Sequence, residues 1–165
     1  MRVRVIKPIE PLMPKKIKTC AYVRVSTDSL SQADSLENQT AAYERLITSN
    51  PEYEFVGIYS DQGLTGYYEN RPGFQKMMEE AHKGNIDLII TKSISRLARN
   101  TVTILKFARE LKEIGVGIFF EEERINTLSS DGELMLTVMA SFAQEESRST
   151  SENIRWSMKK KFERG

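Results

Sequence analysis

The chain has 165 residues, of which 24 are basic and 23 acidic, giving a formal net charge of +1. This length suits one globular domain and excludes two ordinary ones, and the balanced charge means that a nucleic-acid partner must be argued from where the cations lie. Cys20 is the only cysteine, so an internal disulfide is excluded, and no run of about eighteen apolar residues offers a membrane span.

The first 16 residues form a basic leader in which Pro8, Pro11 and Pro14 recur every third residue. This spacing favours an extended arm over a helix, and the arm could lie on phosphates or be a solvated leader. It has no apolar segment of the kind found in secretory signals, so we expect a cytoplasmic protein.

Residues 17–25 predict a first strand that opens into a polar loop. Alternation places Tyr22, Arg24 and Ser26 on one face, which we expect to be chemical, and the apolar residues between them on the other, which we expect to be core. Strand ends of open α/β sheets carry their sites, so Ser26 is a candidate nucleophile and Arg24 an anion holder. The alternative is that the hydroxyl only caps a helix.

The middle of the chain alternates helices and strands. Apolar residues at helical spacing predict a helix over residues 33–49, and a second strand is expected over 54–60. A polar loop then extends from Asp61 to Gly73, and loops of this length are usually functional or disordered. A helix opened by Pro72 runs to about Lys83.

The apolar run 86–91 predicts a buried parallel strand, followed by Lys92–Asn100, where a helical turn would point Arg96 and Arg99 the same way. A helix over 101–114, capped by Asn100, leads to a strand over 116–121. Four alternations of strand and helix predict an α/β fold with a mainly parallel sheet in three layers.

The last quarter, from about residue 129 to 165, predicts a single long helix whose start at Ser130–Glu133 resembles a capping box. Its first half is apolar nearly all round, and its second half is basic. We therefore expect an oligomer interface followed by a basic segment that leaves the globule. The alternative is a helix folded back on the sheet.

Four arginines occupy loop or strand-end positions in this arrangement: Arg24, Arg71, Arg96 and Arg99. Guanidinium groups bind phosphate bidentately and keep their charge, so their convergence on a serine predicts a phosphodiester site. His82 and Cys20 have no partners at ligand spacing, so we expect no metal and no cofactor.

Successive motifs carry a family resemblance. The stretches Tyr22-Val-Arg-Val-Ser26, Ser35-Leu-Glu-Asn-Gln39, Arg71-Pro-Gly73, Ser95-Arg-Leu-Ala-Arg99 and Ala143-Gln-Glu-Glu146 resemble the serine recombinases, the resolvases and DNA invertases, in the right order. The Ser-Leu-Glu-Asn-Gln and Gln-Glu-Glu-Ser-Arg-Ser stretches are most similar to the large serine recombinases of conjugative transposons and phages.

This resemblance implies a site-specific DNA recombinase whose Ser26 becomes joined to a 5′ phosphate of double-stranded DNA. It also implies that Arg24, Arg96 and Arg99 bind the scissile phosphate, and that Arg71 supports the pocket. Tyr22, Gln39 and Asp61 are the further supporting residues.

The long helix, by the same resemblance, pairs subunits into dimers and synaptic tetramers and then crosses the minor groove. Its expected DNA contacts are Arg148, Arg155, Lys159 and Lys160. The domains are then a leader (1–16), a catalytic unit (17–128) and the helix (129–165), with a DNA-binding domain expected beyond residue 165. Two other functions stay open, a metal-free phosphodiesterase on a similar fold and a non-catalytic DNA-binding or assembly module.

The sequence departs from the family pattern at Ser95, where resolvases often carry an acidic residue. The acid or base role of that carboxylate cannot be assigned to this chain, and no other residue identifies itself as the general acid or base.

Overall fold

The computed structural model describes residues 14–25, 32–62, 71–97 and 100–163. The strands in these ranges are β1 (Ile17–Val25), β2 (Tyr53–Gln62), β3 (Leu88–Thr91), β4 (Gly117–Phe120) and β5 (Ile125–Asn126). The helices are α1 (Gln32–Thr48), α2 (Pro72–His82), α3 (Ile94–Leu97), α4 (Thr101–Glu113) and α5 (Ser130–Glu163).

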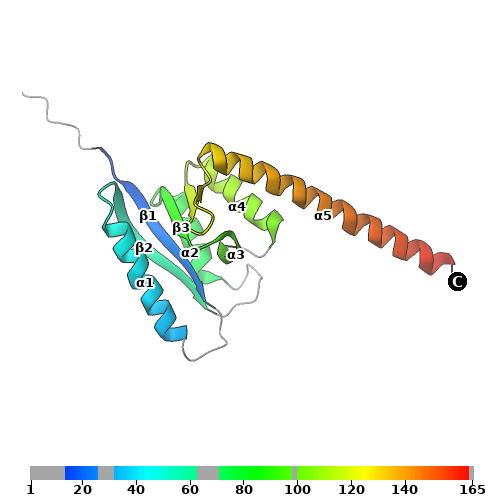
Figure 1. Ribbon diagram of the computed structural model, residues 1–165, viewed down its shortest axis with the longest axis horizontal. Coiled ribbons are helices and arrows are strands. Elements are labelled where there is room, and N and C mark those ends of the chain that lie inside the picture. The colour runs from blue at the N-terminus through cyan, green and yellow to red at the C-terminus, as the bar shows by residue number, and fades with distance from the viewer. Residues whose placement is uncertain (1–13, 26–31, 63–70, 98–99, 164–165) are drawn as a thin grey trace, which may run out of the picture.

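The strands form one sheet in the order β2-β1-β3-β4-β5 (Figure 1). Neighbours among the first four strands are parallel, and β5 is antiparallel to β4. One layer of helix lies on each side of the sheet, so the predicted three-layer, mainly parallel α/β fold is confirmed.

Each face of the sheet has its own core. Beneath α1, strand residues such as Ala21 and Val23 pack with Tyr43 and Ile47. On the opposite face, Tyr22 and its neighbours pack with α2, α3, α4 and the first part of α5. The expectation that one face of β1 is chemical and the other core is therefore wrong for most of the strand. Tyr22 is only 1% exposed because α2 and α4 cover its face.

Most element boundaries lie within one residue of the predictions, and three places differ by more. Strand β2 continues to Gln62, so Asp61 lies in a strand and not in a loop. Strand β3 begins at Leu88, two residues later than expected. Strand β5 was not predicted, because two residues give no periodicity, and it follows Arg124, whose φ of 55° lies in the left-handed region.

The caps of α4 and α5 test two further predictions. Asn100 caps α4 as expected, since its side chain accepts a hydrogen bond of 2.8 Å from the Val102 amide. The capping box of α5 is wrong by one residue, because the hydroxyl that accepts from the Gly132 amide, at 3.1 Å, belongs to Ser129. Glu133 instead forms an ion pair with Lys112 of α4.

Helix α5 is 34 residues long and leaves the globule after its first part (Figure 1). Leu136 and Ala143 are buried against the core that α4 also covers, whereas the residues from 147 to 160 are all exposed. The helix is therefore not folded back on the sheet over its whole length. Within the described ranges, no helix combines the length and hydropathy needed to cross a bilayer.

Candidate active site

The C-terminal edge of the sheet brings together side chains that are far apart in sequence. Parallel strands end at the same edge, and the register places Tyr22 beside both Thr91 and Tyr59. Arg24 follows at the end of β1, Asp61 lies near the end of β2, and Arg71 begins α2 at this edge.

A buried hydrogen-bond network joins Tyr22, Asp61 and Arg71. The Tyr22 hydroxyl donates to Asp61 Oδ2 at 2.9 Å. The same oxygen accepts from Arg71 Nε at 3.1 Å and from Arg71 Nη2 at 2.5 Å. Asp61 and Arg71 are only 4% and 5% exposed, so the hydroxyl links two opposite charges that water does not reach.

Asp61 also anchors the start of α2. Arg71 occupies the N-cap position of that helix but makes no side-chain capping bond there. Asp61 supplies the cap from β2 instead, because its two carboxylate oxygens accept from the amides of Gly73 at 2.8 Å and Phe74 at 2.9 Å. A negative charge at a helix N-terminus is favourable, so the network and the helix stabilise each other.

Gly73 is required by this close approach. A Cβ atom added to Gly73 would overlap the backbone carbonyl of Ser60 in β2. Any larger residue would push α2 away from the strand that carries Asp61.

The Arg71 guanidinium has partners on several sides. Its Nη1 donates to the Leu97 carbonyl oxygen at 2.7 Å, which ties it to the end of α3. Its Cζ atom lies 4.7 Å from the ring centroid of Phe74 and 5.1 Å from that of Tyr22. Arg71 is thus held in place by protein groups and supports the edge from beneath.

Arg24 and Arg96 meet at the surface of the same edge. Arg24 Nη2 donates to the Ser95 carbonyl oxygen at 3.2 Å, and Arg96 Nη1 approaches the Arg24 carbonyl oxygen at 3.5 Å. These contacts join the end of β1 to α3, and both arginine residues are half-buried. Fixed cations of this kind are suited to holding an anion and to stabilising negative charge that develops on it.

The other predicted site residues lie elsewhere. Ser26 and Arg99 are outside the described residues. Gln39 lies on α1, where it lines a cavity of about 250 Å³ with Tyr43, Lys92 and Glu121, on the face of the sheet opposite to Tyr22. The structure therefore does not bring Gln39 to the network of Tyr22, Asp61 and Arg71.

The predicted DNA contacts are exposed side chains of the distal part of α5. Arg148, Arg155 and Lys159 follow one another at spacings of seven and four residues, which places them on one side of the helix. Arg148 pairs with Glu152 at 3.2 Å, and the Lys160 ammonium lies 3.9 Å from the centre of the Trp156 ring.

Burial keeps the Tyr22 hydroxyl protonated. It raises the pKa of Tyr22 well above its ordinary value, and the opposing effect of Arg71 is smaller. A protonated hydroxyl can donate to Asp61 while it accepts from Arg71, which is the pattern observed. In the part of the chain that the structure describes, no three metal-ligating side chains gather at one place.

Sequence reasoning did not identify three groups of this site: the ring of Phe74, the Leu97 carbonyl and the close approach of Gly73. An apolar ring and a backbone carbonyl have no sequence signature. The Arg71-Pro-Gly73 motif did contain the glycine, whose role depends on Ser60 of β2, thirteen residues upstream.

Comparison with known families identifies relatives of the whole arrangement. The family model described as "Resolvase, N terminal domain" matches residues 19–165. A solved structure, that of a resolvase family site-specific recombinase from Streptococcus pneumoniae, is 32% identical with a TM-score of 0.67, and the match covers 88% of this chain and 95% of that one.

Two curated proteins are also similar. A resolvase/recombinase of Pseudomonas putida is 27% identical over 125 residues, which cover 76% of this chain and 62% of the relative. The Transposon Tn21 resolvase of Escherichia coli is 30% identical over 120 residues, which cover 67% of this chain and 63% of the relative. The matched part therefore spans less than two thirds of the length of these relatives.

Proposed function

Because the chain belongs to the family of resolvase N-terminal domains, we propose that it is the catalytic domain of a site-specific recombinase that cleaves and rejoins double-stranded DNA through Ser26. The observation that carries this proposal is that Arg24 and Arg96 each contact a backbone carbonyl of the other's segment, at the strand end that Ser26 follows in sequence. The buried network of Tyr22, Asp61 and Arg71 supports that edge from below.

In the proposed cleavage step, the Ser26 oxygen loses its proton and attacks the phosphorus atom of a DNA phosphodiester. The bond from phosphorus to the 3′ oxygen breaks, and that oxygen leaves as a free 3′ hydroxyl after taking up a proton. The products are a 5′-phosphoserine and a 3′ hydroxyl, so the number of phosphoester bonds is unchanged. Rejoining is the same step with a new 3′ hydroxyl as nucleophile, and it needs neither water nor ATP.

The arginines divide into two roles in this proposal. Arg24, Arg96 and Arg99 bind the non-bridging oxygens of the scissile phosphate, whose charge they stabilise as the serine attacks. Arg71 holds α3 in place through the Leu97 carbonyl, and Tyr22 and Asp61 fix Arg71. Gln39 is the further supporting residue of the pocket, placed on the α1 side of the sheet.

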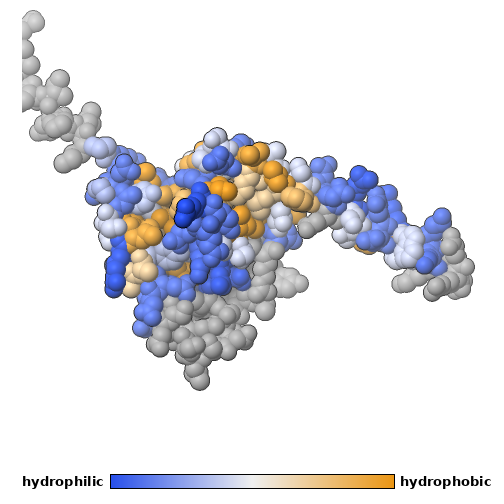
Figure 2. Space-filling model, viewed as in Figure 1, coloured by the Kyte–Doolittle hydropathy of each residue, from blue (hydrophilic) through white to orange (hydrophobic). Residues whose placement is uncertain are grey.

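Helix α5 supplies the proposed assembly and DNA contacts. Leu134, Val138 and Phe142 are 65%, 45% and 65% exposed, and their four-residue spacing makes one apolar strip. Figure 2 shows hydrophobic residues gathered over the near part of α5 and hydrophilic ones over its distal part. We assign the strip to pairing with a second copy of the chain, and Arg148, Arg155, Lys159 and Lys160 to DNA phosphates.

The test is covalent capture of DNA. Duplexes of randomised sequence that carry a fluorophore at each 3′ end are incubated with the chain at low salt, and the products are separated in detergent. The proposal predicts a fluorescent, detergent-stable adduct in which Ser26 carries the phosphate, since the serine remains joined to the labelled fragment. Raising the salt concentration should reduce its yield, because phosphate contacts release counterions.

The Ser26→Ala variant separates the alternatives. A recombinase loses the adduct and keeps its ability to self-associate. A phosphodiesterase releases labelled fragments with a free 5′ phosphate and forms no adduct in either protein. An assembly module gives neither product, and an adduct that persists in Ser26→Ala would exclude Ser26 as the nucleophile.

A further inference from the structure

An aromatic contact extends from the Arg71 network into the groove between α2 and α4. Phe74 lies beneath the Arg71 guanidinium at 4.7 Å and meets the Tyr22 ring edge-on, with centroids 5.6 Å apart and planes at 81°. The same ring meets Phe107 of α4, with centroids 4.8 Å apart and planes at 64°. Both pairs have the edge-to-face geometry that aromatic rings prefer.

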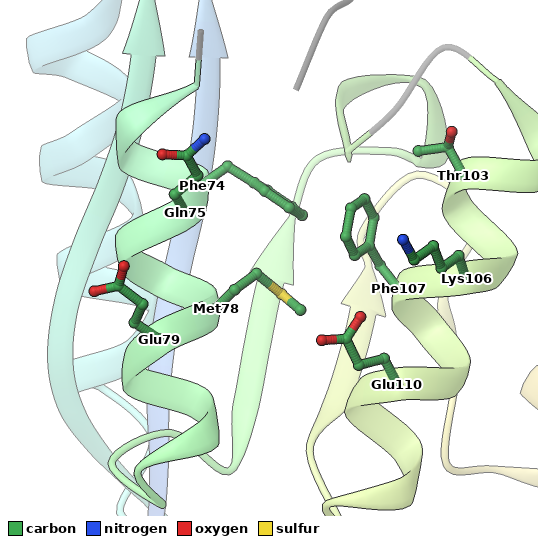
Figure 3. Close-up of a pocket in the computed structure, with 8 residues that line it drawn as sticks. All are labelled: Phe74, Gln75, Met78, Glu79, Thr103, Lys106, Phe107 and Glu110. Atoms are coloured by element: carbon green, nitrogen blue, oxygen red, sulfur yellow. The ribbon is translucent and has the colours of Figure 1, made fainter. Parts of the chain in front are cut away.

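Figure 3 shows Phe74 and Phe107 pointing toward one another across the groove from their two helices. Met78 lines the apolar floor below them, and a cavity of about 600 Å³ opens beside the rings. Phe107 is therefore packed against Phe74 on one side and has open space on another. The backbone of α4 is fixed independently, because Ile104, Leu105 and Ala108 of the same helix are buried.

We infer that Phe107 is a positioning residue for the Arg71 guanidinium and acts through the Phe74 ring. The Phe74 ring forms one wall of the Arg71 site, and Phe107 packs against Phe74 from the α4 side. If Phe107 loses its ring, Phe74 gains room to tilt into the groove and no longer holds the guanidinium against Tyr22.

The consequence for the reaction follows from the Leu97 carbonyl. Arg71 Nη1 donates to that oxygen at 2.7 Å, and Leu97 directly follows Arg96 in α3. A displaced Arg71 releases the end of the helical turn that carries Arg96. The kinetic part of this inference rests on the proposed function, whereas the change in Arg71 itself does not.

The experiment compares two substitutions of Phe107 with a matched control on the same helix. Phe107→Leu removes the ring and keeps an apolar side chain. Phe107→Tyr keeps the ring, and the groove has space for the added hydroxyl. Val102→Ala, at an exposed position of α4, is the control.

With DNA at saturation, Phe107→Leu should slow formation of the covalent adduct about threefold to tenfold, the range that corresponds to one aromatic pair. The dissociation constant for the labelled duplex, measured by fluorescence anisotropy, should stay within about twofold, because the proposed phosphate contacts of α5 are unchanged. Phe107→Tyr and Val102→Ala should match the parent chain. In an Arg71→Lys background, Phe107→Leu should have no further effect on the rate.

A second readout needs no reaction. In the NMR spectrum of the chain labelled with ¹⁵N-arginine, the Arg71 Nε–H signal, assigned by its loss in Arg71→Lys, should move and exchange faster with solvent in Phe107→Leu but not in Phe107→Tyr. An unchanged signal in Phe107→Leu would overturn the inference, and so would an equal loss of rate in the Arg71→Lys background. If the parent chain forms no adduct, the proposed function fails while the NMR result still decides the role of Phe107.

Discussion

Replacing Tyr22 by Phe removes only the oxygen that joins Asp61 to Arg71. The ring stays, so its edge contact with Phe74 is retained. The loss is one hydrogen bond to a carboxylate and the shared acceptor of two guanidinium donors. Each hydrogen bond to a charged group contributes about 1.5–3 kcal/mol, and the two Arg71 donors share one acceptor and are counted as one contact, so the variant should lose about 3–6 kcal/mol of unfolding free energy. The remaining partners of Asp61 and Arg71 keep the fold intact.

Thermal unfolding followed by circular dichroism measures this effect. In a domain of this size, about 1 kcal/mol lowers the melting temperature by about 2–4 °C, so Tyr22→Phe should melt at least about 6 °C below the parent chain. Tyr59→Phe is the matched control, a half-buried tyrosine of β2 that pairs in register with Tyr22. If the two variants melted within about 2 °C of each other, the hydrogen bonds of the Tyr22 hydroxyl to Asp61 and Arg71 would not stabilise the fold by several kcal/mol.

Three further predictions concern residues on both faces of the sheet. Thr91→Val should raise the unfolding free energy by about 1 kcal/mol, because the buried Thr91 hydroxyl has no hydrogen-bond partner within the described ranges, whereas Thr19→Val should lower it, since the Thr19 hydroxyl donates to the Ile17 carbonyl. Chemical denaturation compares the two variants, and a change in the same direction in both would contradict the role given to the two hydroxyl groups. Burial, together with the contact to Glu121, raises the pKa of Tyr43, so the folded chain keeps a proton that the unfolded chain loses near pH 10. The unfolding free energy should therefore fall above that pH by about 1.4 kcal/mol per pH unit for this group. Tyr43→Phe should make this fall less steep, and an unchanged slope would show that Tyr43 does not cause it. Gly73→Ala should cost more than about 2 kcal/mol and expose the Tyr22 site to solvent, as measured by melting temperature and tyrosine fluorescence, and a neutral result would mean that α2 can move away from β2 freely.

The architecture was predictable where one local pattern decided it. The pattern of residues 17–25 predicted β1 with the limits that the structure has. Asn100 directly precedes a helical pattern, so it was predicted as the cap of α4, and it is that cap. The alternation of elements predicted a parallel sheet, but not the strand order, because order depends on which helices cross which face. Strand β5 carries too few residues for any period to be read.

The site was less predictable because its contacts are long-range. Sequence placed Tyr22 and Arg24 on one face of β1 and treated that face as exposed chemistry. The structure buries Tyr22 because α2 and α4 cover the same face, and it leaves Arg24 half-buried only where β1 passes the ends of those helices. Arg71 looked like one more loop cation, and its buried position depends on the Tyr22 hydroxyl of β1 and the Leu97 carbonyl of α3, which reach it from two other elements.

In the apolar part of helix α5, an oligomer interface explains only some of the apolar residues. Leu134 to Ala143 is apolar nearly all round, and the sequence alone attributed the whole of it to an oligomer interface. Leu136 and Ala143 are buried in the chain's own core, and Met139 packs against it. Single exposed apolar residues are ordinary on protein surfaces, but Leu134, Val138 and Phe142 form a continuous strip on the remaining side. The interface hypothesis therefore concerns these three residues, and a Leu134→Ser and Phe142→Ser double variant should separate copies without disturbing the core that Leu136 helps to form.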